Sequence, residues 1–281
     1  MGNISSGTYI NSEDSISQLI FDMLYEGNNK YDATVSLGTW SSLSDVDNFF
    51  NTYNHANGYN GLKLGNYVTI NDGTYNIQWA IAGFDCEHSR FAADGTLYDN
   101  GYGICMIPKK TSLGSGNLCK PDDTLSMGYI QSKIHLETLP AIANSLKNVL
   151  GDHLILRNVL LSDVGILNNE EYADYSATWT TAYLTLLSDQ QYGDRGSVSN
   201  DPLTRGEANY ELPISNYETN YDSCNTFLMD SWCRGSLGYD RDSSYARGLY
   251  TKFNSKDNII VYYNNYTVYS DKSIYPMMYI R

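Results

Sequence analysis

The chain has 281 residues and a mass of 31.6 kDa, which allows one large domain or two modest ones. Its net charge of −14, from 18 basic and 32 acidic residues, argues against a nucleic-acid partner, because phosphate binding needs a basic surface. The same charge argues against an anionic membrane surface, and no apolar run reaches the ~18 residues of a membrane span. Residues 1–15 lack the basic region and the apolar stretch of a signal peptide, so we expect synthesis in the cytoplasm without export.

A helix is predicted first, over residues 12–26. Ser12 suits the N-cap position, two acidic residues follow it in the first turn, and Gly27 suits the C-terminal stop. Five apolar residues repeat at helical spacing and form one stripe: Ile16, Leu19, Ile20, Met23 and Leu24. Two interpretations stay open. The stripe packs on the rest of the chain, or it docks the chain to a partner and builds a homo-oligomer such as a trimer.

A second amphipathic helix is predicted over residues 45–53, with Ser44 as its cap. The glycine- and asparagine-rich stretch at 55–61 predicts a turn. We place a boundary there, between a small helical N-terminal region at residues 1–61 and a second domain at residues 62–281.

The second predicted domain begins with strands. Residues 67–70 and 75–83 flank the tetrapeptide Asn71-Asp72-Gly73-Thr74, which predicts a β-hairpin. The run YGICMIP at 102–108 predicts a buried strand. A helical region follows over residues 129–150, and Pro140 within it predicts two helices or a kink near Thr138.

The remaining elements are another predicted helix and a series of strands. Residues 177–188 predict the helix, with Trp179 on its apolar face. From residue 210 onward the pattern predicts short strands between long tyrosine-rich loops, and residues 274–280 predict a closing strand. Helices and strands occur in separate runs without βαβ alternation, so the predicted fold class is α+β. The apolar surroundings of Trp40, Trp79 and Trp179 place all three in the core.

The C-terminal third of the chain has the composition of a recognition surface. Twelve of the 26 tyrosines lie in residues 209–281, interleaved with Asn, Ser, Asp and Gly. Tyrosine offers rigid contact area and a hydroxyl group, and small polar residues adapt around it. The candidate ligand-binding residues are Trp232, Arg234, Tyr239, Arg241, Tyr245, Arg247, Tyr250, Tyr262, Tyr263, Tyr266 and Tyr269. Two alternatives stay open: these tyrosines cover a sheet, or they form a subunit interface.

The sequence favours neither catalysis nor metal binding. No GxSxG motif is present, and Cys86 and His88, which can meet if they share one face of a strand, are expected to be structural. The acidic pairs Asp122-Asp123 and Glu170-Glu171 can be read as glycosidase carboxylates, but adjacent acids in polar loops are usually solvated. We therefore predict that the chain is not an enzyme and has no cofactor.

The cysteines show no metal-binding pattern. Their spacings are not those of a zinc site, and no EF-hand loop accompanies them. Either all five are buried or half-buried thiols, or Cys224 and Cys233 form one disulfide: Cys86, Cys105, Cys119, Cys224 and Cys233.

Several sequence blocks, in this order, resemble a domain family common in structural proteins of phages and prophages of Gram-positive bacteria. These blocks are YVTINDGTYNIQWAIAGFD (67–85), AADGTLYDNGYGICMIPK (92–109), YIQSKIHLETLPAI (129–142), LKNVLGDHLILRNVLLS (146–162), TWTTAYLTLLS (178–188), GEANYELPI (206–214) and PMMYIR (276–281). The resemblance covers roughly residues 62–281 and implies a C-type-lectin-like fold. It also implies that Trp232 packs near a binding face.

The chain departs from that family in two ways. Where the family often closes with a Gly-Val-Arg-Pro motif, this chain has Ser273, Ile274, Tyr275 and Pro276, so no ligand role of that arginine carries over. The Glu-Pro-Asn and Trp-Asn-Asp signatures of calcium-dependent lectins are absent. We therefore expect any sugar to stack directly on Tyr or Trp.

The resemblance and the composition together predict a non-enzymatic virion protein, at a tail tip, fibre or baseplate, which binds a glycan or protein of the host cell surface. Its other partners are virion proteins. Two alternatives stay open. One is a capsid decoration or head-fibre protein with a purely structural role, and the other is an enzyme that degrades cell-wall or capsule glycans.

Overall fold

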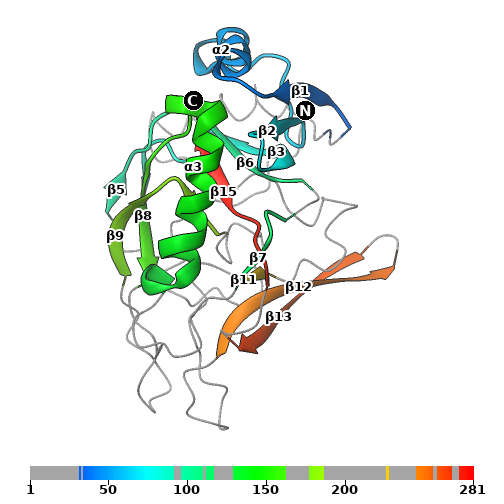
Figure 1. The fold of residues 1–281 in the computed structure, drawn as a ribbon, viewed down its shortest axis with the longest axis vertical. Coiled ribbons are helices and arrows are strands. Elements are labelled where there is room, and N and C mark those ends of the chain that lie inside the picture. Colours follow the sequence, from blue (N-terminus) through cyan, green and yellow to red (C-terminus); the bar gives the residue numbers. More distant parts are fainter. Residues whose placement is uncertain are drawn as a thin grey trace, which may run out of the picture.

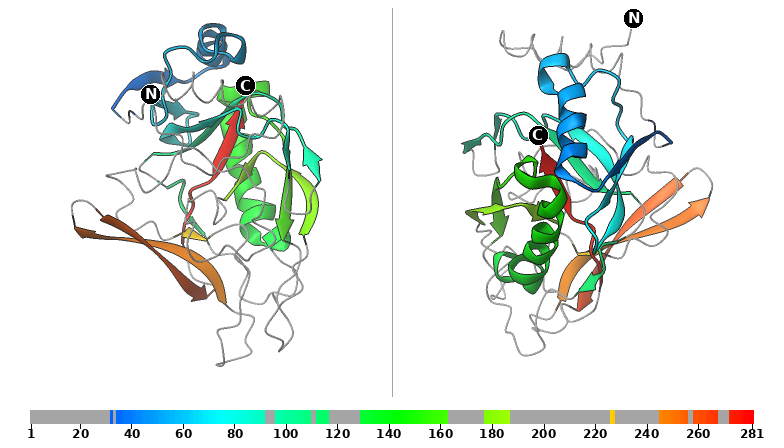
Figure 2. Two further views of the ribbon diagram at one scale, coloured as in Figure 1. Left: turned by 180° about the vertical axis from the view of Figure 1, so that it is seen from behind. Right: turned by 45° about the horizontal axis from the view of Figure 1, so that its top comes forward.

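The protein has a mixed α+β architecture, seen in a computed structural model (Figure 1). The structure describes residues 32, 34–91, 96–109, 112–116, 129–162, 177–186, 226–227, 245–255, 258–267 and 272–281. Figures 1 and 2 show helix α3 running beside strand β15, helix α2 at one end of the molecule, and the hairpin β12–β13 away from α2.

A six-stranded sheet organises the described residues, in the order β1-β2-β3-β6-β15-β10. The first pair is parallel and the other neighbours are antiparallel. The strands are β1 (Ser36–Trp40), β2 (Tyr67–Asn71), β3 (Asn76–Phe84), β6 (Ile104–Pro108), β10 (Leu184–Thr185) and β15 (Met277–Ile280).

The predicted hairpin at residues 67–83 is confirmed as β2 and β3. Tyr67 pairs with Ala80 and Asn71 pairs with Asn76. Asp72 holds the turn, because its Oδ1 accepts hydrogen bonds from the backbone N–H groups of Thr74 and Tyr75, at 2.8 and 2.6 Å. An aspartate side chain that accepts these bonds replaces a backbone partner in a tight turn. The tetrapeptide at 71–74 was therefore sufficient to predict the hairpin.

The central strands form the core, and the predicted buried strand at 102–108 is confirmed as β6. All five residues of β6 and all four of β15 are buried. Continuous burial means that both faces of these strands are covered, unlike the alternation of a strand with one wet face. Helix α3 contacts β2 and β10 of this sheet. Trp40 and Trp79 belong to the core, as predicted.

Strand β15 passes very close to the backbone before β6. An added Cβ at Gly103 would lie 2.6 Å from the carbonyl oxygen of Ile280 and 3.0 Å from the ring of Tyr279. The hydroxyl group of the buried Tyr279 donates to the carbonyl oxygen of Gly101, at 2.9 Å. Burial raises the pKa of Tyr279, so this phenol stays protonated and keeps donating.

The predicted helix at 45–53 is confirmed as α2 (Leu43–Thr52), which begins two residues earlier. Asp45 explains the earlier start. Its carboxylate accepts from the N–H groups of Ser41 and Ser42 and from the Ser42 hydroxyl. These bonds lower the pKa of Asp45 and satisfy backbone donors that a helix start leaves open. Ser42, and not Ser44, is therefore the N-cap.

The predicted helical region at 129–150 is confirmed, and two helical elements of different type meet at Thr138 and Leu139. It consists of η2 (Tyr129–Gln131), the π-helical η3 (Ile134–Thr138) and α3 (Leu139–Leu150). Pro140 lies in the first turn of α3, where its missing N–H would have no partner in the helix. The helix ends at Leu150, with Gly151 as its C-cap, and η4 (Gly151–His153) follows.

The predicted helix at 177–188 is wrong. Residues Ala177–Ala182 form β9, which pairs antiparallel with β8 (Arg157–Ser162), and β10 follows directly. The segment contains the run TWTTA, whose β-branched and aromatic residues suit a pleated strand. Trp179 is only half-buried and contacts the ring of Tyr98, so its predicted place in the core is also wrong.

The prediction of short strands between loops after residue 210 is wrong at residues 245–255 and 258–267, which form long strands, whereas the strands at 226–227 and 272–273 are short. Strands β12 (Tyr245–Ser255) and β13 (Asn258–Thr267) are long and form a three-stranded sheet with β11 (Thr226–Phe227). Two further small pairings join β4 (Arg90–Phe91) with β5 (Leu97–Tyr98), and β7 (Ser115–Gly116) with β14 (Lys272–Ser273). The predicted closing strand at 274–280 is confirmed as β15.

Several contacts cross the predicted boundary after residue 61, and the division itself stays a prediction. Strand β1 hydrogen bonds to β2, and α2 contacts α3. His153 stacks on Phe50 of α2, and its Nε2 lies 2.8 Å from Oδ1 of Asp47. Residues 36–57 therefore pack against the strands and helices that follow. None of the helices in the described part of the chain combines the length and apolar character that a membrane span requires.

Substituting Gly103→Ala should destabilise the protein, by about 1–3 kcal/mol, because the new methyl group meets fixed backbone. The matched control is Gly116→Ala, whose Cβ would meet only the end of the Ile274 side chain at 3.3 Å. Urea unfolding of both variants measures the difference. Equal stability of the two variants would contradict the close packing of β15 on the backbone of Gly103.

Candidate functional site

The predicted recognition residues are only partly within the described structure. Six of them lie in the hairpin β12–β13: Tyr245, Arg247, Tyr250, Tyr262, Tyr263 and Tyr266. Trp232, Arg234, Tyr239, Arg241 and Tyr269 lie outside the described residues. So do the five predicted oligomerisation residues, Ile16, Leu19, Ile20, Met23 and Leu24.

The hairpin register divides these six positions between the two faces of the ladder. Tyr250 is directly opposite Tyr262, and Leu249 is directly opposite Tyr263. Because successive positions of a strand alternate between faces, Tyr245, Arg247 and Tyr263 belong to one face. Tyr250, Tyr262 and Tyr266 belong to the other. Asn264 and Asn265 pair with Gly248 and Arg247 within the ladder, so they lie in a strand and not in a loop.

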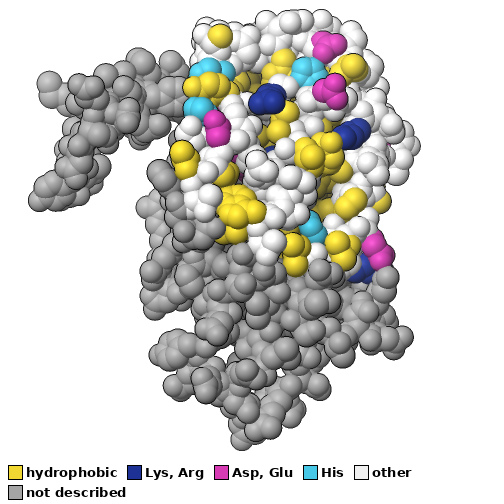
Figure 3. Space-filling model, turned by 90° about the vertical axis from the view of Figure 1, so that its left-hand side faces the viewer, with side chains coloured by type: hydrophobic (Ala, Val, Ile, Leu, Met, Phe, Trp, Pro, Cys, Tyr) yellow, Lys and Arg dark blue, Asp and Glu magenta, His cyan; other side chains and the backbone are white. Residues whose placement is uncertain are grey.

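A second candidate site surrounds Tyr102, in the loop that precedes β6. Its ring stacks on His55 of η1 (His55–Asn57), with centroids 3.5 Å apart and planes 11° apart. The ring of His88 lies 4.0 Å from the same centroid, at 39°. Tyr102 remains 42% exposed. In Figure 3, histidine, acidic and hydrophobic side chains reach the surface close to one another on this side of the molecule.

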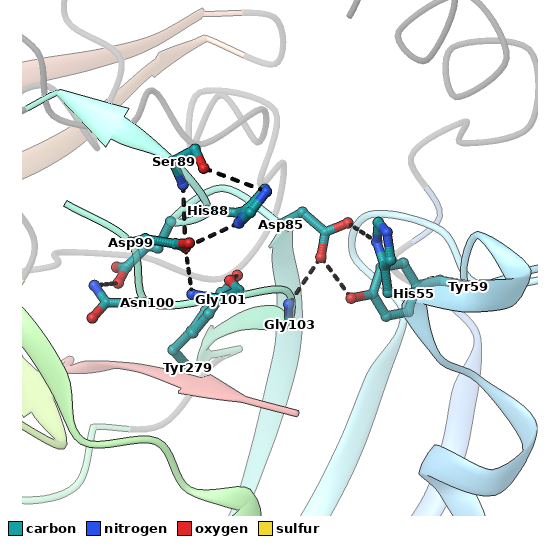
Figure 4. Close-up of polar contacts among 11 residues, drawn as sticks. His55, Tyr59, Asp85, His88, Ser89, Asp99, Asn100, Gly101, Gly103 and Tyr279 are labelled. Atoms are coloured by element: carbon teal, nitrogen blue, oxygen red, sulfur yellow. Dashed lines mark hydrogen bonds and ion pairs between the residues drawn. The ribbon is translucent and has the colours of Figure 1, made fainter. Parts of the chain in front are cut away.

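An aspartate fixes each of these two imidazoles. Oδ2 of the mostly buried Asp85 lies 2.6 Å from Nδ1 of His55. Oδ1 of Asp85 accepts from the hydroxyl group of Tyr59, at 2.6 Å, and from the N–H group of Gly103, at 2.8 Å (Figure 4). Burial and the nearby Asp85 charge raise the pKa of Tyr59, so this hydroxyl group remains a donor.

The second pair extends to a serine. Oδ1 of Asp99 lies 2.9 Å from Nδ1 of His88, and Nε2 of His88 lies 3.4 Å from Oγ of Ser89. Figure 4 shows dashed lines that join the His88 ring to both Ser89 and Asp99. Oδ1 of Asp99 also accepts from the N–H groups of Gly101 and Ser89, at 2.8 and 3.3 Å. The hydrogen bond from Gly101 is the main cause that lowers the pKa of Asp99.

Backbone strain is concentrated in these residues. Among the described residues, three that are not glycine have a positive φ: Tyr59 at 50°, Asp85 at 51° and Ser89 at 48°. All three belong to the hydrogen-bonded set around Tyr102. A left-handed conformation of such residues costs of order 1–3 kcal/mol, and such strain clusters at functional sites. The strain therefore supports a functional role for this loop.

A buried ion pair anchors the same loop from behind. Nη1 of Arg157 donates to Oε1 of Glu87, at 2.5 Å, and Nη2 donates to the hydroxyl group of Thr185, at 2.9 Å. Nδ2 of Asn100 donates to Oε2 of Glu87, at 2.9 Å, and Oδ1 of Asn100 accepts from the N–H group of Asn158, at 2.7 Å. The side chains of Arg157 and Glu87 are 2% and 6% exposed. In the sequence, Glu87 precedes His88 and Asn100 follows Asp99. The contacts of Arg157 with Glu87 and of Glu87 with Asn100 therefore fix both ends of the loop that carries Ser89, His88 and Asp99.

Most of this site has no recognisable signal in the sequence. His88 was paired only with Cys86, on the assumption of a strand, but both residues follow β3 in a turn. Cys86 and Cys105 are buried free thiols, as both cysteine interpretations predict, and Cys119, Cys224 and Cys233 lie outside the described residues. The acidic pairs Asp122-Asp123 and Glu170-Glu171 lie outside the described residues. The only local signal for the site was Asp99-Asn100-Gly101, a turn sequence eleven residues after His88.

Metal binding is not indicated around Tyr102. Within the described ranges, no three His, Cys, Asp or Glu side chains gather closely enough to hold a metal ion. What the set offers is hydrogen-bonding and proton-transfer chemistry.

Removing one partner of the buried pair should be strongly destabilising. We expect Arg157→Met to lower the free energy of unfolding by about 3–5 kcal/mol, because the Glu87 carboxylate loses its buried cation. The double variant Arg157→Met/Glu87→Gln should recover part of that loss, since no uncompensated charge remains. Denaturant unfolding of the single and double variants tests this. A double variant no more stable than the single one would count against an ion pair as the main interaction.

A comparison of the chain with protein-family models, with curated proteins and with solved structures finds no match. The family resemblance and the C-type-lectin-like fold therefore stay predictions, and the functional conclusion depends on the residues themselves.

Proposed function

We propose that this chain is a recognition protein of a phage particle, at a tail tip, fibre or baseplate, and that its hairpin β12–β13 binds a glycan or protein of the host cell surface. The proposal includes a C-type-lectin-like fold for residues 62–281, docking to other virion proteins through the helical N-terminal region, and a homo-oligomer such as a trimer. Binding needs no catalytic step, cofactor or metal. The mixed α+β architecture with a mostly antiparallel central sheet is compatible with that fold.

The observation that supports this proposal is the hairpin itself. Strands β12 and β13 pair over ten positions and lie outside the six-stranded sheet that forms the core. Five tyrosines occupy this ladder, three of them within Tyr262–Tyr266. Rigid aromatic side chains supply binding energy at low entropic cost, and arginine among them adds charged hydrogen bonds. A ladder presents these residues in fixed register, which a loop would not.

The main competitor is a structural role, as a capsid decoration or head-fibre protein. In that case the same hairpin would be a subunit interface, because tyrosine and arginine are enriched there too. The two roles differ in one observable: a host-binding hairpin stays accessible in the assembled particle.

Two double variants test the proposal, because the register places them on opposite faces of the hairpin. Tyr245→Ala/Tyr263→Ala removes two tyrosines from one face, and Tyr250→Ala/Tyr262→Ala removes two from the other. If one face binds, one double variant should raise the Kd for intact Gram-positive cells by at least about tenfold, since buried aromatic anchors contribute more than ~1 kcal/mol. The other variant is its matched control. Fluorescently labelled protein, with and without EDTA, gives the measurement.

Each outcome is informative. Saturable binding that survives EDTA and falls in one double variant supports calcium-independent recognition. Wild-type binding by both folded double variants refutes the role of the hairpin. No binding by folded, oligomeric wild-type protein favours the structural role instead.

A further inference from the structure

We infer that Ser89, His88 and Asp99 form a hydrolytic site that cleaves small neutral acyl esters carried on a larger molecule such as a polysaccharide. This activity goes beyond the proposed recognition role. It also departs from the expectation, drawn from composition, that the chain is not an enzyme.

The three side chains are ordered as a nucleophile, a base and an orienting carboxylate. Asp99 approaches Nδ1 of His88 and Ser89 approaches Nε2, the two opposite nitrogens of the ring. An imidazole that donates from Nδ1 to a carboxylate keeps the lone pair of Nε2 free to accept a serine proton. The 3.4 Å separation is longer than a strong hydrogen bond, and such contacts shorten when substrate binds.

Asp99 is held in the form that this role requires. Three donors converge on its Oδ1, from Gly101, Ser89 and His88. Their combined effect lowers the pKa of Asp99, so the carboxylate stays ionised near neutral pH. An ionised Asp99 orients the His88 ring and stabilises the imidazolium that forms after proton transfer.

Ser89 is exposed and conformationally fixed. Its φ of 48° lies in the left-handed region, and its own N–H group bonds to Asp99. This hydrogen bond holds the strained backbone of the serine next to the base that would activate it. Nucleophilic serines of other hydrolases are likewise displayed on sharp, strained turns.

Tyr102 supplies the remaining group, a donor for the oxyanion. Its ring lies 4.0 Å from that of His88, and none of the described residues makes a hydrogen bond to its exposed hydroxyl group. Tyrosine hydroxyl groups serve in oxyanion holes. His55, stacked at 3.5 Å and bonded to the buried Asp85, is a positioning residue that holds this ring.

The reaction balances with water as the second substrate. The Ser89 oxygen attacks the ester carbonyl, and the serine proton moves to Nε2 of His88 while Tyr102 donates to the new oxyanion. The C–O bond to the alcohol breaks, and His88 returns the proton to the leaving oxygen, which gives an acylated Ser89. Water then attacks, losing a proton to His88, and the carboxylic acid leaves with Ser89 restored.

Exposure and charge limit the substrate. His88 and Asp99 have side chains 31% and 50% exposed, so the site is open to an acyl group on the surface of a polymer. Asp85 and Asp99 lie nearby, in a chain of net charge −14, and this disfavours acyl groups that carry a negative charge. A neutral group such as acetyl fits both constraints.

Two probes test the inference on the 281-residue chain: a fluorophosphonate, which labels activated serines, and the ester 4-methylumbelliferyl acetate. We expect the label on the Ser89 peptide by mass spectrometry, and steady ester hydrolysis. Ser89→Ala should abolish the label and reduce hydrolysis to background. Alanine keeps the Cβ atom of serine, so the backbone strain at this position should be unchanged. The control Ser41→Ala, at an exposed serine beside no histidine, should match wild type. His88→Asn and Asp99→Asn should each reduce kcat by roughly 10²-fold or more.

Tyr102→Phe separates catalysis from packing, because it keeps the stacked ring and removes only the hydroxyl group. We expect kcat to fall by roughly 10²–10³-fold with KM little changed. Hydrolysis by folded Ser89→Ala at the wild-type rate, or no label on Ser89 in folded wild-type protein, overturns the inference. Cell binding by Ser89→Ala should equal that of wild type, so failure of the hydrolytic site and failure of the recognition role are distinguishable.

Discussion

The buried Arg157–Glu87 ion pair is the constraint on which the strained loop depends. Removing two charges from water costs several kcal/mol per ion, and this cost is offset only when the remaining donors and acceptors are also satisfied. Here Thr185, Asn100 and Met277 lie against the two charged groups. The pair therefore joins the loop after β3 to strands β8, β10 and β15. A loop fixed this firmly can hold two of its residues, Asp85 and Ser89, in left-handed conformations.

The aromatic stack continues this anchoring toward the surface. Buried Asp85 links the loop to η1 through His55 and Tyr59, and the same carboxylate accepts from the backbone at Gly103. One carboxylate thus joins an early helix-rich segment, the strained turn and the entry to β6. The exposed part of the stacked rings of His55, Tyr102 and His88 is both polar and rigid. A site that positions reacting groups requires both properties.

The sequence predicted those elements that are determined by interactions between residues close together in the chain. Turn chemistry at Asp72 and the apolar stripe of α2 depend on neighbouring residues, and both were recognised. Strand β9 was read as a helix because Trp179 and Tyr183 also fit a helical spacing, and its pairing with β8 is a tertiary effect. The strands of the tyrosine hairpin were read as loops for a similar reason, since asparagines within them resemble a turn. The site around Tyr102 joins residues 55, 85 and 102, and its left-handed conformations leave no trace in residue type, so spacing alone could not reveal it.

The central sheet also has a kinetic consequence. Met278 of β15 pairs with Met106 of β6, 172 positions earlier, so the middle of the sheet closes only through contacts between distant parts of the chain. Loop-closure entropy must be overcome before such pairs contribute, and topologies rich in them fold slowly. Before β15 pairs with β6 during folding, β6 is an exposed edge strand of almost wholly apolar residues. Such an edge can pair with strands of other chains. We expect folding yield, more than folded-state stability, to limit how much of this protein a cell can accumulate.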